Sequence, residues 1–592
     1  MILQSLVQYY EALVGKGAIG KPGWGTAKVS GRLHLDREGN FIGIINTRTE
    51  VQQGKKLVER DAVINVPEPV KRTSKPLANY MCDNASYLLG YDGNNVSKNK
   101  FEATKELHHK ILDGCTSPAA KAILHFFDNW DPEKAADSPL LQDKENLAKA
   151  SNFIFQVSDV DALEDNDIRE AWDKYKQGAK EDDSTYGQCL VTGRKNVPIA
   201  RIHPNIKGVR GAQTSGAAIV SFNTNALESY GHDGEQGNNA PVGEYAAFAY
   251  SAALNYLIRE RKCSLVGGDT VVYWSADANP LYQDGFSECM GNDAGISETD
   301  LAAMIEKISK GQRADISGVT LSPDEPFYVL GLAPNAARLS IRFFYRNTFG
   351  ATIAHIAEHH QRMKIVRPSW EKQEQIPLWR LLKATVNPHS KDPASSPLLA
   401  GSLLRSILQG QPYPEAMYQN ILLRVFSDQD ERGDNGTTTV NKITYVKAAF
   451  IKAYLLKNHF ERWGEDLTMA VNEDCKALPY VLGRLFSVLE ALQEAANPGI
   501  NATIKDRYFN AACATPGSVF PTLMKLANAH LAKLEKRQQV YYSKKLQALA
   551  DEIVMPNQGK PIPSRLNQEE QGVFILGYYQ ETQKRFTKKE EK

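Results

Sequence analysis

The stretch PNIKGVRGAQTSGAAIVSFNTNALESY, residues 204–230, joins a glycine-rich basic loop to an apolar run. Glycines at 208, 211 and 216 can adopt φ > 0 or let the backbone approach a ligand closely. Between residues 186 and 220 the chain has five Lys or Arg and no Asp or Glu. Lys207 and Arg210, with the small polar side chains that follow them, have the chemistry of a surface that contacts a sugar-phosphate backbone. The simpler alternative is a glycine-rich turn before a buried strand at residues 217–222, and the residue types alone favour it.

Hydrophobic periodicity predicts a mixed first half of the chain. A short helix over residues 3–13 precedes a hairpin in RLHLDREGNFIGIINT, with its turn at residues 36–40. Residues 95–185 are predicted to be mostly helical, with Trp130, Phe153, Phe155 and Trp172 in the core. Strand-like runs follow in AAIVSF, DTVVYW, FYVLGLA and RLSIRFFY, and EYAAFAYSAALNYLIRER between them is predicted to be a helix. Residues 278–312 contain several turn signals and are predicted to form a surface insertion.

From about residue 350 onward the pattern is almost entirely helical. Apolar stripes within residues 478–492 and 520–534 predict packed helices, and Asn567 with Glu570 has the spacing of a capping box. The fold class is therefore α+β: a mixed α/β N-terminal body with basic loops, then a mainly α-helical C-terminal region that ends in a helical bundle. We divide the chain into a mixed α/β N-terminal region (1–345), a helical connecting region (346–468) and a C-terminal helical bundle (469–592).

Composition excludes several classes of protein. The chain has 42% hydrophobic and 23% charged residues, as in an ordinary globular protein, and no run of 18 apolar residues that would predict a membrane helix. Its N-terminus lacks the order of a signal peptide, and its seven cysteines form no CxxC pair, which together favour a reducing cytoplasm. The formal net charge of +1 hides local excesses of +5 in residues 1–80, −8 in 131–185 and +5 in 186–220. Such basic patches can bind phosphate despite a neutral total.

A second basic segment precedes Asn79. Its residues are Lys71, Arg72, Thr73, Ser74 and Lys75, which place three cations within five positions beside two hydroxyl groups. The cations could neutralise phosphates, and the polar side chains could read base edges. A solvated loop is the alternative, and charge alone does not decide between the two.

Two constellations could carry catalysis. His355, Glu358 and His359 match the H-x-x-E-H pattern of inverted zinc peptidases, in which two histidines one helical turn apart share a metal. Cys189 and His203 could form a nucleophile pair, but nothing in the sequence shows contact or an orienting group. Both sets are better explained as structural residues. The sequence also lacks a phosphate-loop lysine motif and a two-metal nuclease cluster. We therefore expect a protein that is not an enzyme and has no cofactor or bound metal.

Several long segments of the sequence resemble those of a known family. The phrases that carry it span nearly the whole chain: MILQSLVQYYEAL, IKGVRGAQTSGAAIVSFN, ESYGHDGEQGNNAPVGEYAAFAYSAALNYL, FYVLGLAPNAARLSIRFFYRNTFG, LPYVLGRLFSVLEALQEAA, TIKDRYFNAACATPGSVFPTLMKLANAHLAKLEK and QGVFILGYYQ. In this order they resemble the large subunit of the type I-C CRISPR surveillance complex (Cascade). The resemblance implies a non-catalytic subunit that recognises the protospacer-adjacent motif in double-stranded DNA, assists duplex opening, stabilises the R-loop and helps recruit a helicase-nuclease. It also implies that residues 1–345 recognise the motif and bind the duplex, and that the bundle at residues 469–592 resembles the small subunit.

The same resemblance implies the partners. These are CRISPR RNA, target double-stranded DNA, the repeated backbone subunit, the subunit that processes CRISPR RNA, the helicase-nuclease and a small subunit, with no membrane. In this family the small subunit can arise from an internal start, and Met469 stands just before the predicted bundle. A purely helical scaffold is a third possibility, but it leaves the basic loops unexplained. The candidate DNA-binding residues are Lys71, Arg72, Thr73, Ser74, Lys75, Asn79, Lys207, Arg210, Gln213, Ser215 and Asn223.

Overall fold

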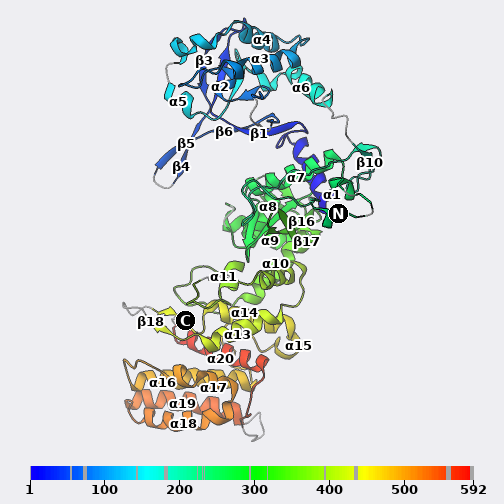
Figure 1. Cartoon of the computed structure of the whole chain (residues 1–592). Coiled ribbons are helices and arrows are strands. Elements are labelled where there is room, and N and C mark those ends of the chain that lie inside the picture. Colours follow the sequence, from blue (N-terminus) through cyan, green and yellow to red (C-terminus); the bar gives the residue numbers. More distant parts are fainter. Residues whose placement is uncertain are drawn as a thin grey trace. The chain divides into compact units, whose positions relative to one another are not determined.

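The computed structural model describes residues 2–53, 56–70, 76–141, 144–178, 185–222, 224–229, 231–232, 234–292, 295–316, 318–391, 395–432, 438–554 and 562–586 (Figure 1). The chain forms two compact units. Unit 1 comprises Met1–Asn205 and Ala218–Tyr256, and unit 2 comprises Ile206–Ala217 and Leu257–Lys592. Strands occur in both units and helices dominate after residue 349, so the predicted α+β class is confirmed. The units divide the chain at positions other than 345 and 468, and the roles assigned to the three predicted regions stay predictions.

The main sheet of unit 1 has the strand order β3-β2-β8-β7, with the short β9 paired to β8. The expected hairpin is formed by β2 (Gly31–Leu35) and β3 (Phe41–Asn46), which run antiparallel. β8 (Phe153–Val157) lies parallel to β2 and is a strand within residues 95–185, which are otherwise mostly helical, as predicted. It is a central strand in which Phe153 and Phe155 are 3% and 0% exposed. A strand buried on both faces reads as a continuous apolar run, which periodicity cannot distinguish from a buried helix.

Aromatic side chains form much of the core of unit 1. Phe126 and Phe127 of α4 (Pro118–Asn129) both contact the ring of Phe155 on β8. The other strands of this unit are β1 (Trp24–Val29), β4 (Thr49–Gln53), β5 (Lys56–Arg60), β6 (Ala62–Pro67), β7 (Cys82–Asp83), β9 (Val160–Asp161), β10 (Tyr186–Gly187) and β11 (Val197–Pro198). Its other helices are α1 (Ile2–Gly15), α2 (Ala85–Leu88), α3 (Lys98–Leu112), α5 (Lys144–Lys149), α6 (Asn166–Gly178) and α7 (Glu244–Arg259), whose last turn belongs to unit 2. The predicted helices at residues 3–13 and 244–261 correspond to α1 and α7.

Unit 2 begins with an antiparallel sheet of order β12-β13-β16-β17. Its strands are β12 (Cys263–Val266), β13 (Asp269–Ser275), β16 (Pro326–Asn335) and β17 (Arg338–Thr348), and the last three confirm the predicted runs. A β-bulge shifts the β16–β17 register after Gly331. The ring of Phe343 occupies the space beside Gly331, where an added Cβ would lie 2.5 Å from it. A glycine at this position thus lets the sheet bury the aromatic ring of its edge strand.

Two sequence predictions near this sheet were wrong. Residues 278–312 are not a surface insertion, because α8 (Pro280–Cys289) and α9 (Glu298–Ser309) bury Tyr282 and Met304 in the core of unit 2. The Asn-Pro signal here is a helix start, in which Asn279 caps the helix and proline occupies its first turn. The strand expected at residues 217–222 is also absent: Ala217 forms a single bridge to Ile206, and none of the described residues 218–222 belongs to a strand. A short apolar run becomes a strand only where a neighbouring strand pairs with it.

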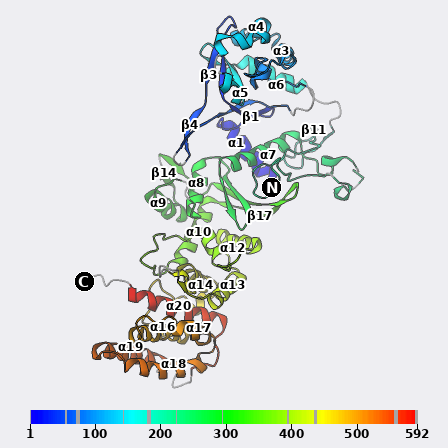
Figure 2. The ribbon, with the colours of Figure 1, turned by 60° about the vertical axis from the view of Figure 1, so that its left-hand side comes forward.

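The helical part of unit 2 shares one continuous core with the sheet. Figure 2 shows α20 (Gln568–Phe586) beside α16 (Leu478–Ala496), and α20 also packs against α14 (Tyr445–Asn458). The core runs from the sheet through α14 to α16 and α20. The predicted capping box at the start of α20 is confirmed, since the Asn567 and Glu570 side chains each accept a hydrogen bond from the other's backbone N–H. The remaining elements are β14 (Ala314–Ile316), β15 (Val319–Leu321), α10 (Phe349–Met363), α11 (Leu378–Lys383), α12 (Pro397–Gln409), α13 (Glu415–Ser427), β18 (Glu431–Arg432), β19 (Thr438–Val440), α15 (Phe460–Trp463), α17 (Ile504–Ala514), α18 (Pro516–Leu531) and α19 (Lys536–Val554).

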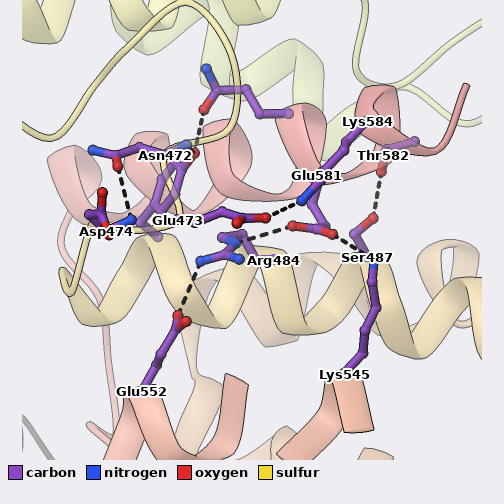
Figure 3. A network of polar contacts seen from close by, with 12 residues as sticks. Asn472, Glu473, Asp474, Arg484, Ser487, Lys545, Glu552, Glu581, Thr582 and Lys584 are labelled. Carbon is purple, nitrogen blue, oxygen red and sulfur yellow. Dashed lines mark hydrogen bonds and ion pairs between the residues drawn. The ribbon is translucent and has the colours of Figure 1, made fainter. Parts of the chain in front are cut away.

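A buried ionic network joins three helices of the C-terminal bundle (Figure 3). Arg484 of α16 donates one hydrogen bond to Glu581 of α20 and one to Glu552 of α19, each 3.1 Å long. Lys545 of α19 donates to the second carboxylate oxygen of Glu581 at 3.1 Å. The side chains of Arg484 and Glu581 are only 7% and 3% exposed. Because a buried charge is stable only beside its partners, this network fixes how α16, α19 and α20 align.

None of the helices in the described ranges combines the length and the apolar character needed to cross a bilayer.

Candidate nucleic-acid interface

The glycine-rich loop, defined as residues 206–217, is closed at its base and held on the sheet of unit 2. Ile206 and Ala217 exchange two backbone hydrogen bonds of 2.9 Å, which join the two ends of the loop. Near its middle, the backbone N–H of Arg210 donates to the Thr270 hydroxyl of β13 at 3.3 Å. Val209 is 4% exposed and anchors the same turn in the apolar interior. The loop is therefore supported at three points.

The glycines of this loop have the backbone conformation that the sequence predicted. Gly208, Gly211 and Gly216 have φ values of 81°, 79° and 94°. Two of them also approach other parts of unit 2 closely. A Cβ at position 208 would lie 2.9 Å from Ile258, and one at position 211 would lie 3.1 Å from Pro334. Glycine at these positions permits both the turn and the close packing of the loop on its support.

The polar side chains of the glycine-rich loop face solvent, whereas Ile206, Val209 and Ala217 are buried. Lys207, Arg210, Gln213 and Ser215 are all exposed. Within the described part of the chain, the Arg210 guanidinium makes no ion pair, which leaves its charge available. Two cations, an amide and a hydroxyl group on a supported loop can neutralise phosphates and donate hydrogen bonds to them or to base edges.

A further cation near the glycine-rich loop was missed in the sequence. Arg342 of β17 lies 3.8 Å from Asp269, the residue before the Thr270 that holds the loop. Burial raises the pKa of the Asp269 carboxyl group, and the Arg342 guanidinium acts in the opposite direction. The side chain of Arg342 is 48% exposed, so its charge also faces solvent. Only the pairing of β13, β16 and β17 brings position 342 near position 270, and the spacing of basic residues along the chain gives no signal of it.

The other candidate residues are placed differently. Lys71, Arg72, Thr73, Ser74, Lys75 and Asn223 lie outside the described residues. Asn79 is 9% exposed, and its side-chain oxygen accepts a 2.9 Å hydrogen bond from the backbone N–H of Val70. Its own backbone N–H donates to Asp83 at 2.9 Å. Asn79 therefore ties residue 70, which directly precedes the second basic segment, to residue 79, which lies four positions after its end.

The three residues of the H-x-x-E-H pattern in α10 have separate partners. His355 donates from Nδ1 to the carbonyl oxygen of Leu408 at 2.9 Å, and Glu358 pairs with Arg362 at 2.5 Å. His359 is buried against the Tyr413 hydroxyl at 2.6 Å, and this burial lowers its pKa well below the usual value. His355 and His359 thus hold α10 against its neighbours, whereas the Glu358–Arg362 pair lies within α10 itself. Over the ranges that the structure describes, no three His, Cys, Asp or Glu side chains are placed to share a metal ion.

Cys189 and His203 do not form a nucleophile pair either. Burial alone would raise the pKa of the Cys189 thiol, but hydrogen bonds from the backbone and from Thr192 lower it. The Nδ1 of His203 lies 2.6 Å from the Tyr250 hydroxyl, and burial lowers the pKa of this imidazole to about 4. Each side chain is therefore held by partners of its own in unit 1.

Comparison with known proteins assigns the chain to a family. Residues 6–586 match the family model described as CRISPR-associated protein (Cas_Csd1). A search of curated proteins found no match. The family match covers nearly the whole chain, as the resemblance to the type I-C large subunit implied. The chain, with its supported basic loop and its helical C-terminal half, therefore belongs to the Csd1 family of CRISPR-associated proteins and is a large subunit of the Cascade type.

Proposed function

We propose that this large subunit recognises the protospacer-adjacent motif in double-stranded DNA, assists opening of the duplex and stabilises the R-loop. The observation that carries the proposal is the glycine-rich loop, which presents Lys207, Arg210 and Gln213 from a fixed position on the sheet of unit 2. The two cations neutralise backbone phosphates, and the amide donates to or accepts from base edges. Arg342 adds a third positive charge near the same support.

The proposed role requires no catalytic group in this chain. Pairing with guide RNA reads most of the target sequence, while protein side chains read a few base pairs and hold the strands. The separate hydrogen bonds of His355, Glu358 and His359 support a structural role for the H-x-x-E-H pattern, which is one of the two constellations that suggested catalysis. In this proposal the helicase-nuclease that the complex recruits cuts the DNA. The other partners are CRISPR RNA, the repeated backbone subunit and the subunit that processes CRISPR RNA.

A small subunit made from the C-terminal bundle belongs to the same proposal. Met469 is 58% exposed and precedes all of the helices α16–α20. Its carbonyl oxygen accepts hydrogen bonds from the backbone N–H of Val366 and from the Gln580 side chain. A product that starts at Met469 would retain Gln580, the ionic network of Figure 3 and the capped start of α20, but not Val366.

The test removes the two loop cations from the assembled complex. Lys207→Ala combined with Arg210→Ala should weaken binding to a target duplex and reduce the slope of log K against log salt by about 1.8, since each phosphate contact contributes roughly 0.9. The matched control replaces by alanine Lys307 of α9 and Lys310, the residue that follows the end of this helix. Both are exposed cations with the same spacing in the same unit. If the loop variant keeps the wild-type slope while its melting temperature falls, the two cations stabilise the fold and the proposal fails.

A further inference from the structure

Two tryptophans of unit 2 are exposed to solvent, which is unusual for this residue type. Trp370 is 72% exposed and Trp379 is 54% exposed. The other five tryptophans of the chain, at positions 24, 130, 172, 274 and 463, are buried or half-buried. An indole left in water contributes nothing to the core, so a pair of them indicates a surface that binds something.

A buried ion pair brings the two indoles to the same place. Arg380 of α11 donates to Glu371 at 2.5 Å and to Gln373 at 3.2 Å. The Glu371 side chain is only 7% exposed, and its bond to Arg380 lowers its pKa. Trp370 and Trp379 are the residues directly before Glu371 and Arg380, so this pair fixes both tryptophans at one site. Both line a hollow of about 340 Å³, which we call the tryptophan hollow. Its volume lies within the range of about 300 to 1,000 Å³ that is typical of ligand sites.

The segment that carries both tryptophans of the hollow is basic in sequence. Residues 361–391 contain seven Lys or Arg and two Asp or Glu. Lys383 lines the hollow, is exposed and makes no ion pair within the described residues. Asp428 is an acidic residue of the lining, and its charge is balanced by Lys447 at 2.6 Å and Arg424 at 3.4 Å. The hollow therefore presents flat aromatic surfaces and a net positive charge.

A second hollow of about 430 Å³ adjoins the first, since Val386 lines both. Its lining is rich in hydroxyl and amide groups, among them Thr385, Asn387, Ser390 and Ser402. Such short polar side chains commonly contact phosphate and sugar oxygens. The tryptophan hollow thus provides aromatic stacking surfaces and a cation, and the second hollow provides an adjacent surface of polar side chains.

We propose that the tryptophan hollow binds single-stranded DNA, with unpaired bases stacked on Trp370 and Trp379 and the adjacent phosphates paired with Lys383. Bases of any sequence can stack on an indole, and a groove of positive charge can follow the backbone. The uncompensated Lys383 and the polar second hollow favour this occupant over a protein segment, whose interface would be depleted in lysine. The inference rests on the proposed function, because opening of the duplex is what supplies an unpaired strand.

The test measures binding of a thymidine 20-mer to the purified full-length chain at low salt. The oligonucleotide should quench the fluorescence of the two exposed tryptophans. Trp370→Ala and Trp379→Ala should each weaken its binding by about 5- to 150-fold, the usual effect of losing one stacking surface. Lys383→Glu should weaken binding and reduce its salt dependence without any effect on folding, because this side chain is exposed.

Controls separate this inference from other outcomes. Phe586→Ala removes an aromatic residue that is 68% exposed elsewhere and should leave binding of the 20-mer unchanged. Trp370→Phe should retain more affinity than Trp370→Ala, which a loss of folding would not explain. The inference is overturned if the 20-mer neither quenches fluorescence nor distinguishes the tryptophan variants, or if these variants lose only binding of the helicase-nuclease protein. In either case, intact binding of the assembled complex to target duplex leaves the proposed function standing, whereas failure of the wild-type complex to bind any target duplex refutes that function itself.

Discussion

Within the C-terminal bundle, we expect neutralisation of Glu581 to lower the free energy of unfolding most, because this carboxylate pairs with two cations. Its carboxylate accepts from Arg484 of α16 and from Lys545 of α19, both at 3.1 Å, and its side chain is 3% exposed (Figure 3). Glu581→Gln keeps the shape of the side chain but removes the charge. Arg484, at 7% exposed, would then retain one carboxylate partner, Glu552.

The expected cost follows from this geometry. Removing one partner of a buried pair typically destabilises a protein by about 3 to 5 kcal/mol. Because Glu552 still faces Arg484, we expect the lower end, about 3 kcal/mol. At about 2 °C per kcal/mol for a large domain, the melting temperature should fall by about 6 °C. Urea unfolding followed by circular dichroism gives the free energy, and a thermal melt gives the temperature.

A control variant and a double variant test this interpretation. Lys476→Gln removes an outer pair, since Lys476 is 52% exposed and lies 3.7 Å from Glu552, and should cost less than about 1 kcal/mol. Arg484→Met combined with Glu581→Gln should cost less than the sum of the two single changes, because neither residue then leaves the other without its partner. A Glu581→Gln cost below 1 kcal/mol, or strict additivity in the double variant, would refute the reasoning.

Further predictions concern the basic loop, Asn79 and the C-terminal bundle. Gly208→Ala should strain a φ of 81° by about 1 to 2 kcal/mol and weaken duplex binding by the complex; unchanged binding and melting would contradict this. Gln213→Ala should change the preference of the complex among flanking motifs in a binding competition, and an equal loss on all motifs would argue against base reading. Asn79→Ala should lower the free energy of unfolding by about 1 to 3 kcal/mol, because the backbone N–H of Val70 loses its acceptor; a variant as stable as wild type would show that this bond is dispensable. Mass spectrometry of the complex made from the intact gene should find a fragment beginning near Met469, and full-length chain alone in every preparation would exclude the internal start.

Much of the fold could be predicted because its signals are local. The β2–β3 hairpin, the helix α7 and the capping box at Asn567 each depend on residues close together in the chain, where turn propensity and hydrophobic periodicity act directly. The positive φ angles of Gly208 and Gly211 follow from the same local rule. Sequence reasoning also identified the loop that carries Lys207 and Arg210, because a run without acidic residues is visible in the sequence.

Tertiary structure decided what depends on distant partners. An apolar run became the strand β8 because β2 lies beside it, whereas residues 218–222 formed none. The side-chain oxygen of Asn79 accepts a hydrogen bond from the backbone N–H of Val70. Arg342 lies near Thr270 only because β13, β16 and β17 pair in one sheet. The exposure of Trp370 and Trp379 was equally invisible, since the sequence does not reveal which indole finds a place in the core. Local patterns specify backbone conformation and charge, but the neighbours of a side chain, and hence its burial, partners and availability to a ligand, are set by contacts between residues far apart in the chain.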